Sequence, residues 1–183
     1  MIEEKKMILK EDFPIVIERY PYSESLNKKL LKDMKNVPWR TKDECNYYTN
    51  IFADQCHCSD SDPSPGLLIV KEWVEKLLRS KVAPDYYLGA KEHDAKIDIR
   101  MWYAKYDKGD YTQTHHHSFV LYAFVYFIKT PKGSSPLVFT KSGKKIKAEE
   151  GKVVIFPGVL RHHVPKNRCD DRIIVAGNVV FTQ

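Results

Sequence analysis

The sequence lacks any long apolar run. No stretch approaches the roughly 20 consecutive apolar residues that a membrane-spanning helix needs, so we expect no membrane segment. The first residues, MIEEKKMILKEDFP, mix acidic residues with lysines and contain no apolar core typical of a secretory signal. We therefore expect a cytoplasmic protein.

Cysteine is scarce and irregularly spaced. The chain has only four, Cys45, Cys56, Cys58 and Cys169, and a cytoplasmic location disfavours disulfides. The Cys-His-Cys run at 56–58, with Cys45 upstream, leaves zinc binding as an alternative, but the second paired knuckle of structural zinc sites is missing. We expect these cysteines to be free thiols in a loop.

Acidic residues are outnumbered by basic ones, which gives a net charge of +6. A solvated lysine-rich hairpin is the favoured interpretation of the basic region, and a surface for nucleic acid or an acidic substrate is the alternative. Segment 141–152, KSGKKIKAEEGK, has neither the arginines nor the aromatics of a nucleic-acid surface, so we expect no nucleic-acid partner. The lysines concerned are Lys129, Lys132, Lys141, Lys144, Lys145, Lys147 and Lys152.

The two halves of the chain differ in pattern. Apolar residues at helical spacing predict helices within 23–37 and 64–84, a short strand is expected within 12–21, and polar residues predict a long loop over 37–66. After residue 94, β-branched and aromatic runs alternate with Gly, Pro and Ser turns, as in a sandwich or barrel. We predict one α+β, mainly β domain over 1–183, with helical support and a loop in 1–94 and a jelly-roll core in 95–183.

Histidines form two clusters within the predicted β region. His115, His116 and His117 are consecutive, and His162 and His163 follow a Phe-Pro-Gly turn. Residues two apart on an extended strand point the same way, so His115 and His117 are expected to share a face and His116 to point away. With His162 as a third ligand they predict a metal site, for which imidazole suits iron, zinc and copper alike. His163 is expected not to bind the metal.

Arg172 is the second residue of interest. It follows His162 by ten positions and is expected on the next strand, which returns along the sheet beside the ligand. A guanidinium pairs bidentately with a carboxylate, so a dicarboxylate that chelates the metal would present its far end to Arg172. His57 and His93 are isolated, and we expect surface or core roles for them.

These residues lie in segments that resemble a known family. MWYAKYDKGDYTQTHHH, VYF and KVVIFPGVLRHHVPKNRCDDRIIVAGNVVF are similar to the 2-oxoglutarate- and iron(II)-dependent oxygenases, and most of all to the prolyl-4-hydroxylase-like branch with its small phage and marine-bacterial members. The resemblance covers roughly residues 97–182. It implies a double-stranded β-helix, or jelly roll, with N-terminal supporting helices.

The resemblance also implies roles for single residues. His115 matches the first metal ligand and His162 the distal one, which together with His117 implies an Fe(II) site that uses O2. Four other residues match the co-substrate pocket: the residue that binds the far carboxylate of 2-oxoglutarate, a tyrosine that faces the iron pocket, a tyrosine that assists the same carboxylate and a pocket-lining side chain. These four are Arg172, Tyr106, Tyr126 and Asn178.

The sequence departs from the family at one ligand. Where the family has Asp or Glu, this chain has His117, and no acidic residue occurs between residues 118 and 148 to replace it. We predict a three-histidine site. Three neutral ligands leave a divalent metal with its full charge, so we expect weaker metal retention or a shifted metal preference.

The resemblance implies hydroxylation of a C–H bond, with succinate and carbon dioxide as co-products and a prolyl residue of a peptide or protein as the expected target. A nucleic-acid demethylase is disfavoured, because such enzymes carry a second arginine where this chain has Asn178. Two other classes stay open: a cupin-like three-histidine dioxygenase that does not use 2-oxoglutarate, and a non-enzymatic jelly-roll binding module.

Overall fold

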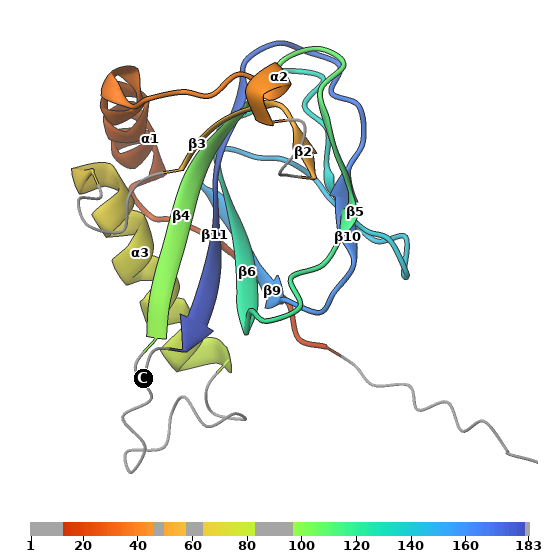
Figure 1. The fold of residues 1–183 in the computed structure, drawn as a ribbon. Helices are drawn as coiled ribbons and strands as arrows, with labels where there is room; N and C mark the ends of the chain where they lie inside the picture. The colour runs from red at the N-terminus through yellow and green to blue at the C-terminus, as the bar shows by residue number, and fades with distance from the viewer. Residues whose placement is uncertain (1–12, 46–49, 58–63, 83–96, 182–183) are drawn as a thin grey trace, which may run out of the picture.

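The computed structural model describes residues 13–45, 50–57, 64–82 and 97–181. Figure 1 shows its elements. The helical segments are α1 (Ser23–Asp33), η1 (Met34–Asn36), α2 (Lys42–Cys45), α3 (Pro65–Leu77) and η2 (Leu78–Val82). The strands are β1 (Val16–Arg19), β2 (Ile51–Phe52), β3 (Asp54–His57), β4 (Ile97–Tyr106), β5 (Tyr111–His115), β6 (Tyr122–Lys129), β7 (Leu137–Phe139), β8 (Lys145–Ile146), β9 (Lys152–Pro157), β10 (His162–Val164) and β11 (Arg172–Phe181).

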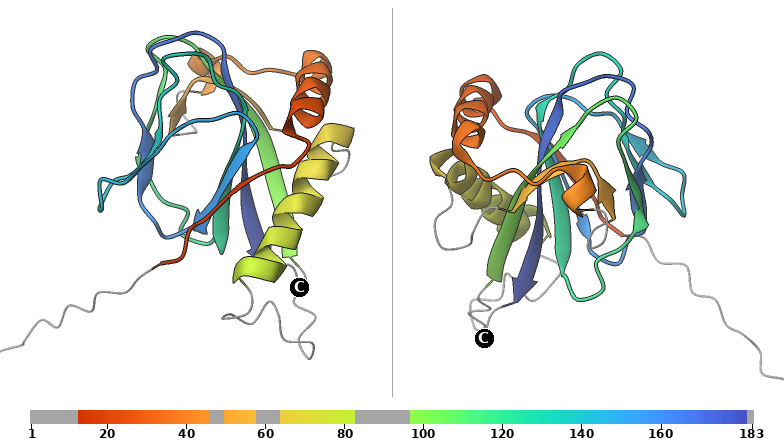
Figure 2. Two further views of the ribbon diagram at one scale, coloured as in Figure 1. Left: turned by 180° about the vertical axis from the view of Figure 1, so that it is seen from behind. Right: turned by 45° about the horizontal axis from the view of Figure 1, so that its top comes forward.

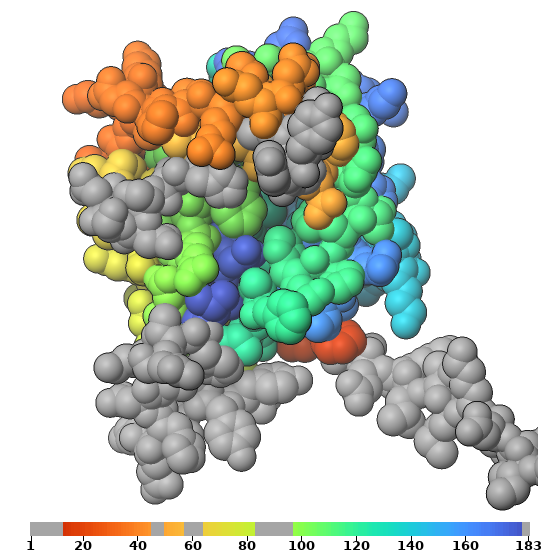
Figure 3. Space-filling model, in the orientation of Figure 1, coloured from red at the N-terminus to blue at the C-terminus, as the bar shows by residue number. Residues whose placement is uncertain are grey.

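The strands form two antiparallel sheets that face each other. A six-stranded sheet has the order β1-β9-β6-β11-β4-β3, and a five-stranded sheet has the order β2-β5-β10-β7-β8. The views in Figures 1 and 2 show the two sheets as separate walls with α1 and α3 on the outer side of the larger one. In Figure 3, part of β11 is visible between β4 and the teal segment that follows β5. The predicted mainly β jelly roll is confirmed.

The larger sheet separates two apolar cores, and strand β6 shows how. Ala123, Val125 and Phe127 belong to the core between the sheets, whereas Tyr126 and Ile128 belong to the core beneath the helices. Because successive side chains of a strand point to opposite faces, a strand buried on both faces reads as a continuous apolar run. This accounts for the unbroken apolar and aromatic sequence of β6.

The two long helices bury their apolar stripes against the outer face of the larger sheet. Leu26 and Leu30 of α1 and Val70 and Val74 of α3 are buried there. At helix α3, Ser64 is the N-cap, its side chain accepts a hydrogen bond from the amide of Leu67 (3.4 Å), and a proline occupies the first turn, as helix starts favour. The helices therefore stiffen the sheet that carries β11.

Glycine is needed where the two helices cross. A Cβ on Gly66 would lie 2.8 Å from a carboxylate oxygen of Asp33 and 2.9 Å from a side-chain carbon of Leu30. The same carboxylate accepts a hydrogen bond from the Gly66 amide at 2.8 Å. The start of α3 therefore rests directly on the end of α1, and a side chain at this position would require the side chains of Asp33 and Leu30 to move.

The expected long loop over 37–66 was wrong in its described parts. It contains α2 and two short strands, of which β3 pairs with β4 and β2 pairs with β5. The segment is polar because both strands lie at sheet edges, where one side meets solvent, and its few apolar side chains, such as Ile51 and Ala53, are buried. It joins the edges of the two sheets on one side of the β-helix (Figure 1).

The first half of the chain therefore supplies sheet strands as well as helices. β1 pairs with β9, and β2 and β3 extend one edge of each sheet, so the predicted division at residue 94 is not a division of the β structure. Paired edge strands protect the ladder of their neighbours. The short strand expected within 12–21 is confirmed as β1, whereas the sequence pattern did not indicate β2 and β3. The assignment of 1–183 to one domain stays a prediction.

Candidate metal centre

Three histidines from two neighbouring strands converge on one point between the sheets. His115 ends β5, His117 follows it, and His162 begins β10 directly opposite His115 in the ladder. The ring centroids are 5.0 Å apart for His115 and His117, 4.3 Å for His115 and His162, and 5.3 Å for His117 and His162. One nitrogen from each ring lies within 4.8 Å of the other two. Three imidazoles at this spacing are suited to hold one metal ion.

A bulge in β5 sets the direction of the first ligand. Thr112 pairs with Val164 and His115 pairs with His162, so three steps along β5 match two steps along β10. Both Thr112 and His162 are buried. The extra residue in β5 allows Thr112 and His115 to point inward together, which strict alternation forbids. The sequence pattern did not predict this irregularity.

Backbone carbonyls fix the orientation of two of the rings. Nδ1 of His115 lies 2.8 Å from the carbonyl oxygen of Gln113, and Nδ1 of His162 lies 2.8 Å from the carbonyl oxygen of Leu160. A carbonyl only accepts, so each Nδ1 carries the proton and each Nε2 keeps its lone pair. A hydrogen bond of this kind orients histidines that bind metals.

All three imidazoles are held in the neutral form that a metal requires. Burial, together with smaller effects of His115 and His116, lowers the pKa of His117 to about 4. Burial also lowers the pKa of His162 to about 3, against a smaller opposing effect of its carbonyl partner, and it lowers the pKa of His115. The three histidines are therefore neutral at neutral pH before any ligand binds.

The other two clustered histidines point away from this site. His116 is exposed and its Nδ1 lies 3.2 Å from the hydroxyl of Ser118. Nδ1 of His163 lies 3.0 Å from the hydroxyl of Thr140. The predicted division of the clusters into three inward and two outward histidines agrees with these positions.

A close contact holds the loop after the ligand in place. The amide of His117 donates to the carbonyl of Gly158, and the amide of Gly158 donates to the carbonyl of Leu121. A Cβ on Gly158 would lie 2.3 Å from the carbonyl oxygen of Val120, so only glycine allows this approach. The two loops that flank the histidines therefore support each other.

The histidines line a cavity that extends between the sheets to Arg172. Arg172 opens β11 opposite Tyr106, the last residue of β4, and its side chain is fully buried. The guanidinium lies over the Tyr106 ring at 4.6 Å and near the Phe127 ring at 5.6 Å. The other lining residues are mostly apolar and include Ile51, Trp102, Val125, Leu137, Phe156, Val164, Ile174 and Ala176.

None of the three guanidinium nitrogens of Arg172 donates a hydrogen bond within the part of the chain that the structure describes. Burial lowers the pKa of Arg172, and the neighbouring Tyr106 partly opposes this effect. Burial likewise raises the pKa of Tyr106, whose hydroxyl lies 2.8 Å from the hydroxyl of Thr112. A buried, unpaired cation in an apolar cavity is costly, and a bound carboxylate would compensate it.

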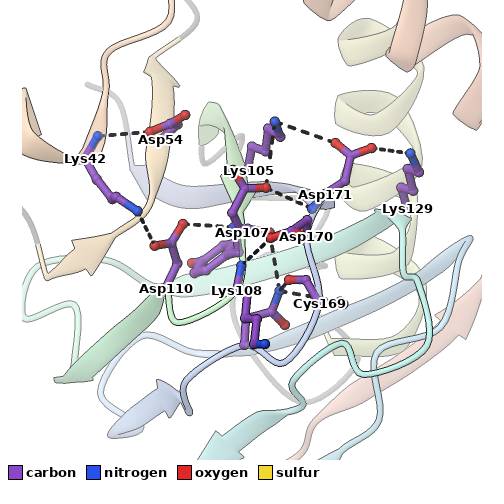
Figure 4. Close-up of polar contacts among 12 residues, drawn as sticks. Lys42, Asp54, Lys105, Asp107, Lys108, Asp110, Lys129, Cys169, Asp170 and Asp171 are labelled. Atoms are coloured by element: carbon purple, nitrogen blue, oxygen red, sulfur yellow. Dashed lines mark hydrogen bonds and ion pairs between the residues drawn. The ribbon is translucent and has the colours of Figure 1, made fainter.

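A polar network of lysines and aspartates, drawn in Figure 4, fixes the ends of β4 and β11, which carry Tyr106 and Arg172. The side-chain amide of Asn167, which is buried, donates to the carbonyls of Tyr106 (3.3 Å) and Cys169 (2.6 Å). Its side-chain oxygen accepts from the amide of Ser135 at 2.9 Å. Asn167 therefore ties together the turns at the Arg172 end of the cavity, a role that the sequence reasoning missed.

Aspartates complete this network. A carboxylate oxygen of Asp107 accepts from the amide of Asp171 (2.9 Å), and Asp110 accepts from the amide of Asp107 (2.8 Å) and pairs with Lys42 (2.8 Å). Asp171 has a positive φ of 65° immediately before Arg172, a conformation that aspartate tolerates better than most residues. Lys129 forms an ion pair with Asp171. These contacts fix the turn from which Arg172 enters the cavity.

Two of the predicted co-substrate residues lie elsewhere. Tyr126 points to the helix side of the larger sheet, where its hydroxyl donates to the side-chain oxygen of Asn27 at 2.7 Å. Its predicted role at the 2-oxoglutarate carboxylate is wrong, because Phe127 occupies the inward position of β6. Asn178 lies on the same strand as Arg172, but beyond the residues that line the cavity, so its predicted lining role is not supported.

The remaining sequence predictions concern cysteines and lysines. Cys56 is buried in the helix-side core, which disagrees with a loop thiol, because β3 joins the larger sheet. Cys58 and His93 lie outside the described residues, as do the side chains of Cys45 and His57. The predicted lysine-rich hairpin is confirmed: β7 pairs with β8, and Lys141, Lys144 and Lys145 are exposed there.

Two cavity residues had no signal in the sequence pattern. Thr112 lies beside Tyr106 only because of the bulge in β5, and Ile51 reaches the cavity from the segment expected to be a loop. Among the helices in the described part of the chain, none has the length and apolar character needed to cross a membrane.

Comparison with known proteins gives similar structures and no similar sequences. No protein-family model and no curated protein match the sequence. The viral collagen prolyl hydroxylase from Paramecium bursaria Chlorella virus-1, in complex with 2-oxoglutarate, is 15% identical and has a TM-score of 0.67, covering 90% of this chain and 94% of that one.

Two further solved structures show the range of similar proteins. A Trichoplax adhaerens prolyl hydroxylase, in complex with a hypoxia-inducible factor peptide fragment, is 12% identical with a TM-score of 0.65, covering 90% of this chain and 82% of that one. HygX from Streptomyces hygroscopicus, with nickel, 2-oxoglutarate and hygromycin B bound, is 7% identical with a TM-score of 0.63, covering 91% and 82%. This chain therefore has the double-stranded β-helix fold of 2-oxoglutarate oxygenases.

Proposed function

We propose that this protein is an Fe(II)- and 2-oxoglutarate-dependent dioxygenase that hydroxylates a prolyl residue in a peptide or protein and releases succinate and carbon dioxide. The observation that carries the proposal is Arg172. Its guanidinium is fully buried and unpaired among the described residues, and it lies in the same cavity as three converging histidines. A dicarboxylate bound to a metal at one end and to Arg172 at the other would use both features.

His115, His117 and His162 would hold the iron through neutral nitrogens. When bound, the metal supplies the site at which 2-oxoglutarate and O2 react. The residues fit this group, because their spacing suits a single ion and the carbonyl bonds leave Nε2 of His115 and His162 available. Imidazole donors suit Fe(II), although they do not select it over zinc or copper.

The chain's own residues would position the co-substrate and exclude water. Arg172 would pair with the far carboxylate, and the stacked ring of Tyr106 would keep the guanidinium in place. The walls between Arg172 and the histidines include the buried apolar residues Val125, Leu137 and Ile174. A water-poor cavity limits side reactions of a bound oxidising centre.

A peptide is the proposed substrate class. The loops that follow His117 and precede His162 carry exposed apolar side chains, Phe119 at 97% and Val159 at 56% exposure. Apolar side chains beside a catalytic cavity are suited to contact a peptide. Two of the similar structures are named as prolyl hydroxylases, and one of them holds a peptide, whereas HygX holds hygromycin B. The fold alone thus does not select the substrate.

A three-histidine dioxygenase that does not use 2-oxoglutarate is the second candidate. The histidine at position 117 favours it, since the iron oxygenases with a facial triad use a carboxylate as one ligand. That alternative leaves the buried guanidinium of Arg172 without a counter-charge among the described residues. We therefore favour the 2-oxoglutarate enzyme.

The test is a coupled turnover assay. The purified protein is loaded with Fe(II) under anaerobic conditions, mixed with 2-oxoglutarate and a proline-containing peptide, and exposed to oxygen. We expect succinate to form and peptide mass to increase by one oxygen atom. If succinate forms but the peptide is not oxidised, 2-oxoglutarate stands as the co-substrate and the peptide is rejected as the substrate. No succinate with any peptide would reject the proposed activity.

A further inference from the structure

The cavity has an excess of positive charge once it is loaded. A divalent metal on three neutral imidazoles keeps both of its charges, and Arg172 adds a third. The two carboxylates of 2-oxoglutarate would compensate two of these three. Replacing one imidazole by a carboxylate would make the loaded site neutral, so the excess of about one positive charge arises from His117.

The described lining of the cavity supplies no negative charge to offset this excess. Of the lining residues that the structure describes, none is acidic. The buried carboxylate of Asp110, which acts on Tyr106, is already paired with Lys42 at 2.8 Å and accepts the amide of Asp107 at 2.8 Å.

An uncompensated charge in an apolar enclosure attracts a counter-ion strongly. The walls of the cavity between the histidines and Arg172 are mostly buried and apolar, so bulk ions screen the charge poorly. From this charge balance, and building on the proposed function, we propose that the metal- and 2-oxoglutarate-loaded site binds one further monovalent anion beside the histidines, either a halide or a carboxylate of the substrate.

The test uses Co(II) as a spectroscopic substitute for iron, with no turnover. Azide is titrated into the anaerobic Co(II)–2-oxoglutarate–protein complex while the visible absorption of Co(II) is followed. The Kd of 2-oxoglutarate for the Co(II) protein is then measured in chloride, acetate and methanesulfonate at equal ionic strength. We expect saturable azide binding, and a Kd about tenfold lower in chloride or acetate than in methanesulfonate. An effect of chloride would indicate a halide, and an effect of acetate alone would indicate a substrate carboxylate.

Two variants with the same charge change locate the effect. His117→Asp introduces the missing negative charge at the metal, and we expect it to abolish azide binding and the anion dependence. His116→Asp introduces the same charge on the exposed side, where Nδ1 of His116 lies 3.2 Å from the hydroxyl of Ser118, and we expect azide binding and the anion dependence to persist in it. Circular dichroism checks that both variants fold. The salt series on the wild type tests the proposal even if a variant does not fold.

The outcomes separate this proposal from the proposed function. If 2-oxoglutarate binds the Co(II) protein but azide does not, and the three salts give the same Kd, the anion site is overturned and the proposed function stands. Persistence of the anion dependence in His117→Asp would also overturn it. If 2-oxoglutarate fails to bind the Co(II) protein in every salt, both proposals are overturned.

Discussion

Replacing Arg172 by methionine is expected to make the ligand-free protein more stable and to weaken its binding of 2-oxoglutarate. The guanidinium is 0% exposed and its nitrogens are unpaired within the described chain, and its favourable contacts are the Tyr106 and Phe127 rings at 4.6 and 5.6 Å. Those contacts contribute about 1–2 kcal/mol. The effective cost of burying an unpaired ion is several kcal/mol.

The balance sets the magnitude of the effect. A methionine of similar length fills most of the space, so we expect a gain of about 1–3 kcal/mol in the free energy of unfolding. For a chain of this size, that is a rise in Tm of about 3–10 °C. Loss of the charged pair with a carboxylate should cost about 2–4 kcal/mol of binding, which raises the Kd of 2-oxoglutarate about 30- to 700-fold.

Thermal unfolding and isothermal titration test both parts. The unfolding of wild type and Arg172→Met is compared without ligand, and 2-oxoglutarate is then titrated into each protein loaded with Mn(II). Affinity for Mn(II) itself is the internal control and should change little, because Arg172 is not among the converging ligands. If Arg172→Met lost stability and kept its 2-oxoglutarate affinity, Arg172 would be a structural residue and the reasoning would be refuted.

Three further predictions concern the ligands and the network. His117→Ala should lower the affinity for the metal at least about tenfold, whereas His116→Ala should leave it unchanged, as measured by isothermal titration. If the two variants bound the metal equally well, His117 would not be a ligand. The free energy of unfolding of the metal-free protein should fall as pH is lowered from 6.5 toward 4 and 3, because the unfolded chain then takes up protons that the buried ligands, with pKa values of about 4 and 3, do not. Urea unfolding at several pH values checks this, and a flat profile would contradict it. Asn167→Ala should raise the Kd of 2-oxoglutarate severalfold with little change in metal affinity, since Asn167 holds the turns beside Arg172 and not the histidines; a parallel loss of both affinities would show a general folding defect.

The sequence was sufficient for features that depend on local pattern. Alternation along an extended segment predicted that His115 and His117 share a face, and the resemblance gave His162 as the distal ligand. The three rings do converge, and His162 pairs with His115 in the ladder. Arg172 was expected on a strand beside that of His162 in the same sheet, and this part was wrong. β10 lies in the five-stranded sheet and β11 in the six-stranded sheet, so Arg172 meets the histidines across the cavity between the sheets. The helices were recognisable from the spacing of their apolar residues. At α3, a serine cap and a proline in the first turn also marked where the helix begins.

Features that depend on tertiary pairing were not predictable. Tyr126 and Phe127 are adjacent, and motif matching alone could not decide which faces the cavity in a strand buried on both sides. The strands β2 and β3 are short and polar, and they form because strand edges are available to pair with them. The bulge that turns Thr112 inward and the contacts of Asn167 involve residues far apart in the sequence.

The central claim is that the three histidines and Arg172 bind a metal and 2-oxoglutarate together in one cavity. The most direct measurement is an anaerobic absorption titration of the Fe(II)-loaded protein with 2-oxoglutarate. The account predicts a metal-to-ligand charge-transfer band that saturates with 2-oxoglutarate in the wild type, disappears in His162→Ala, and needs far more 2-oxoglutarate in Arg172→Met. A wild-type protein that binds Fe(II) and develops no band at any 2-oxoglutarate concentration would contradict it.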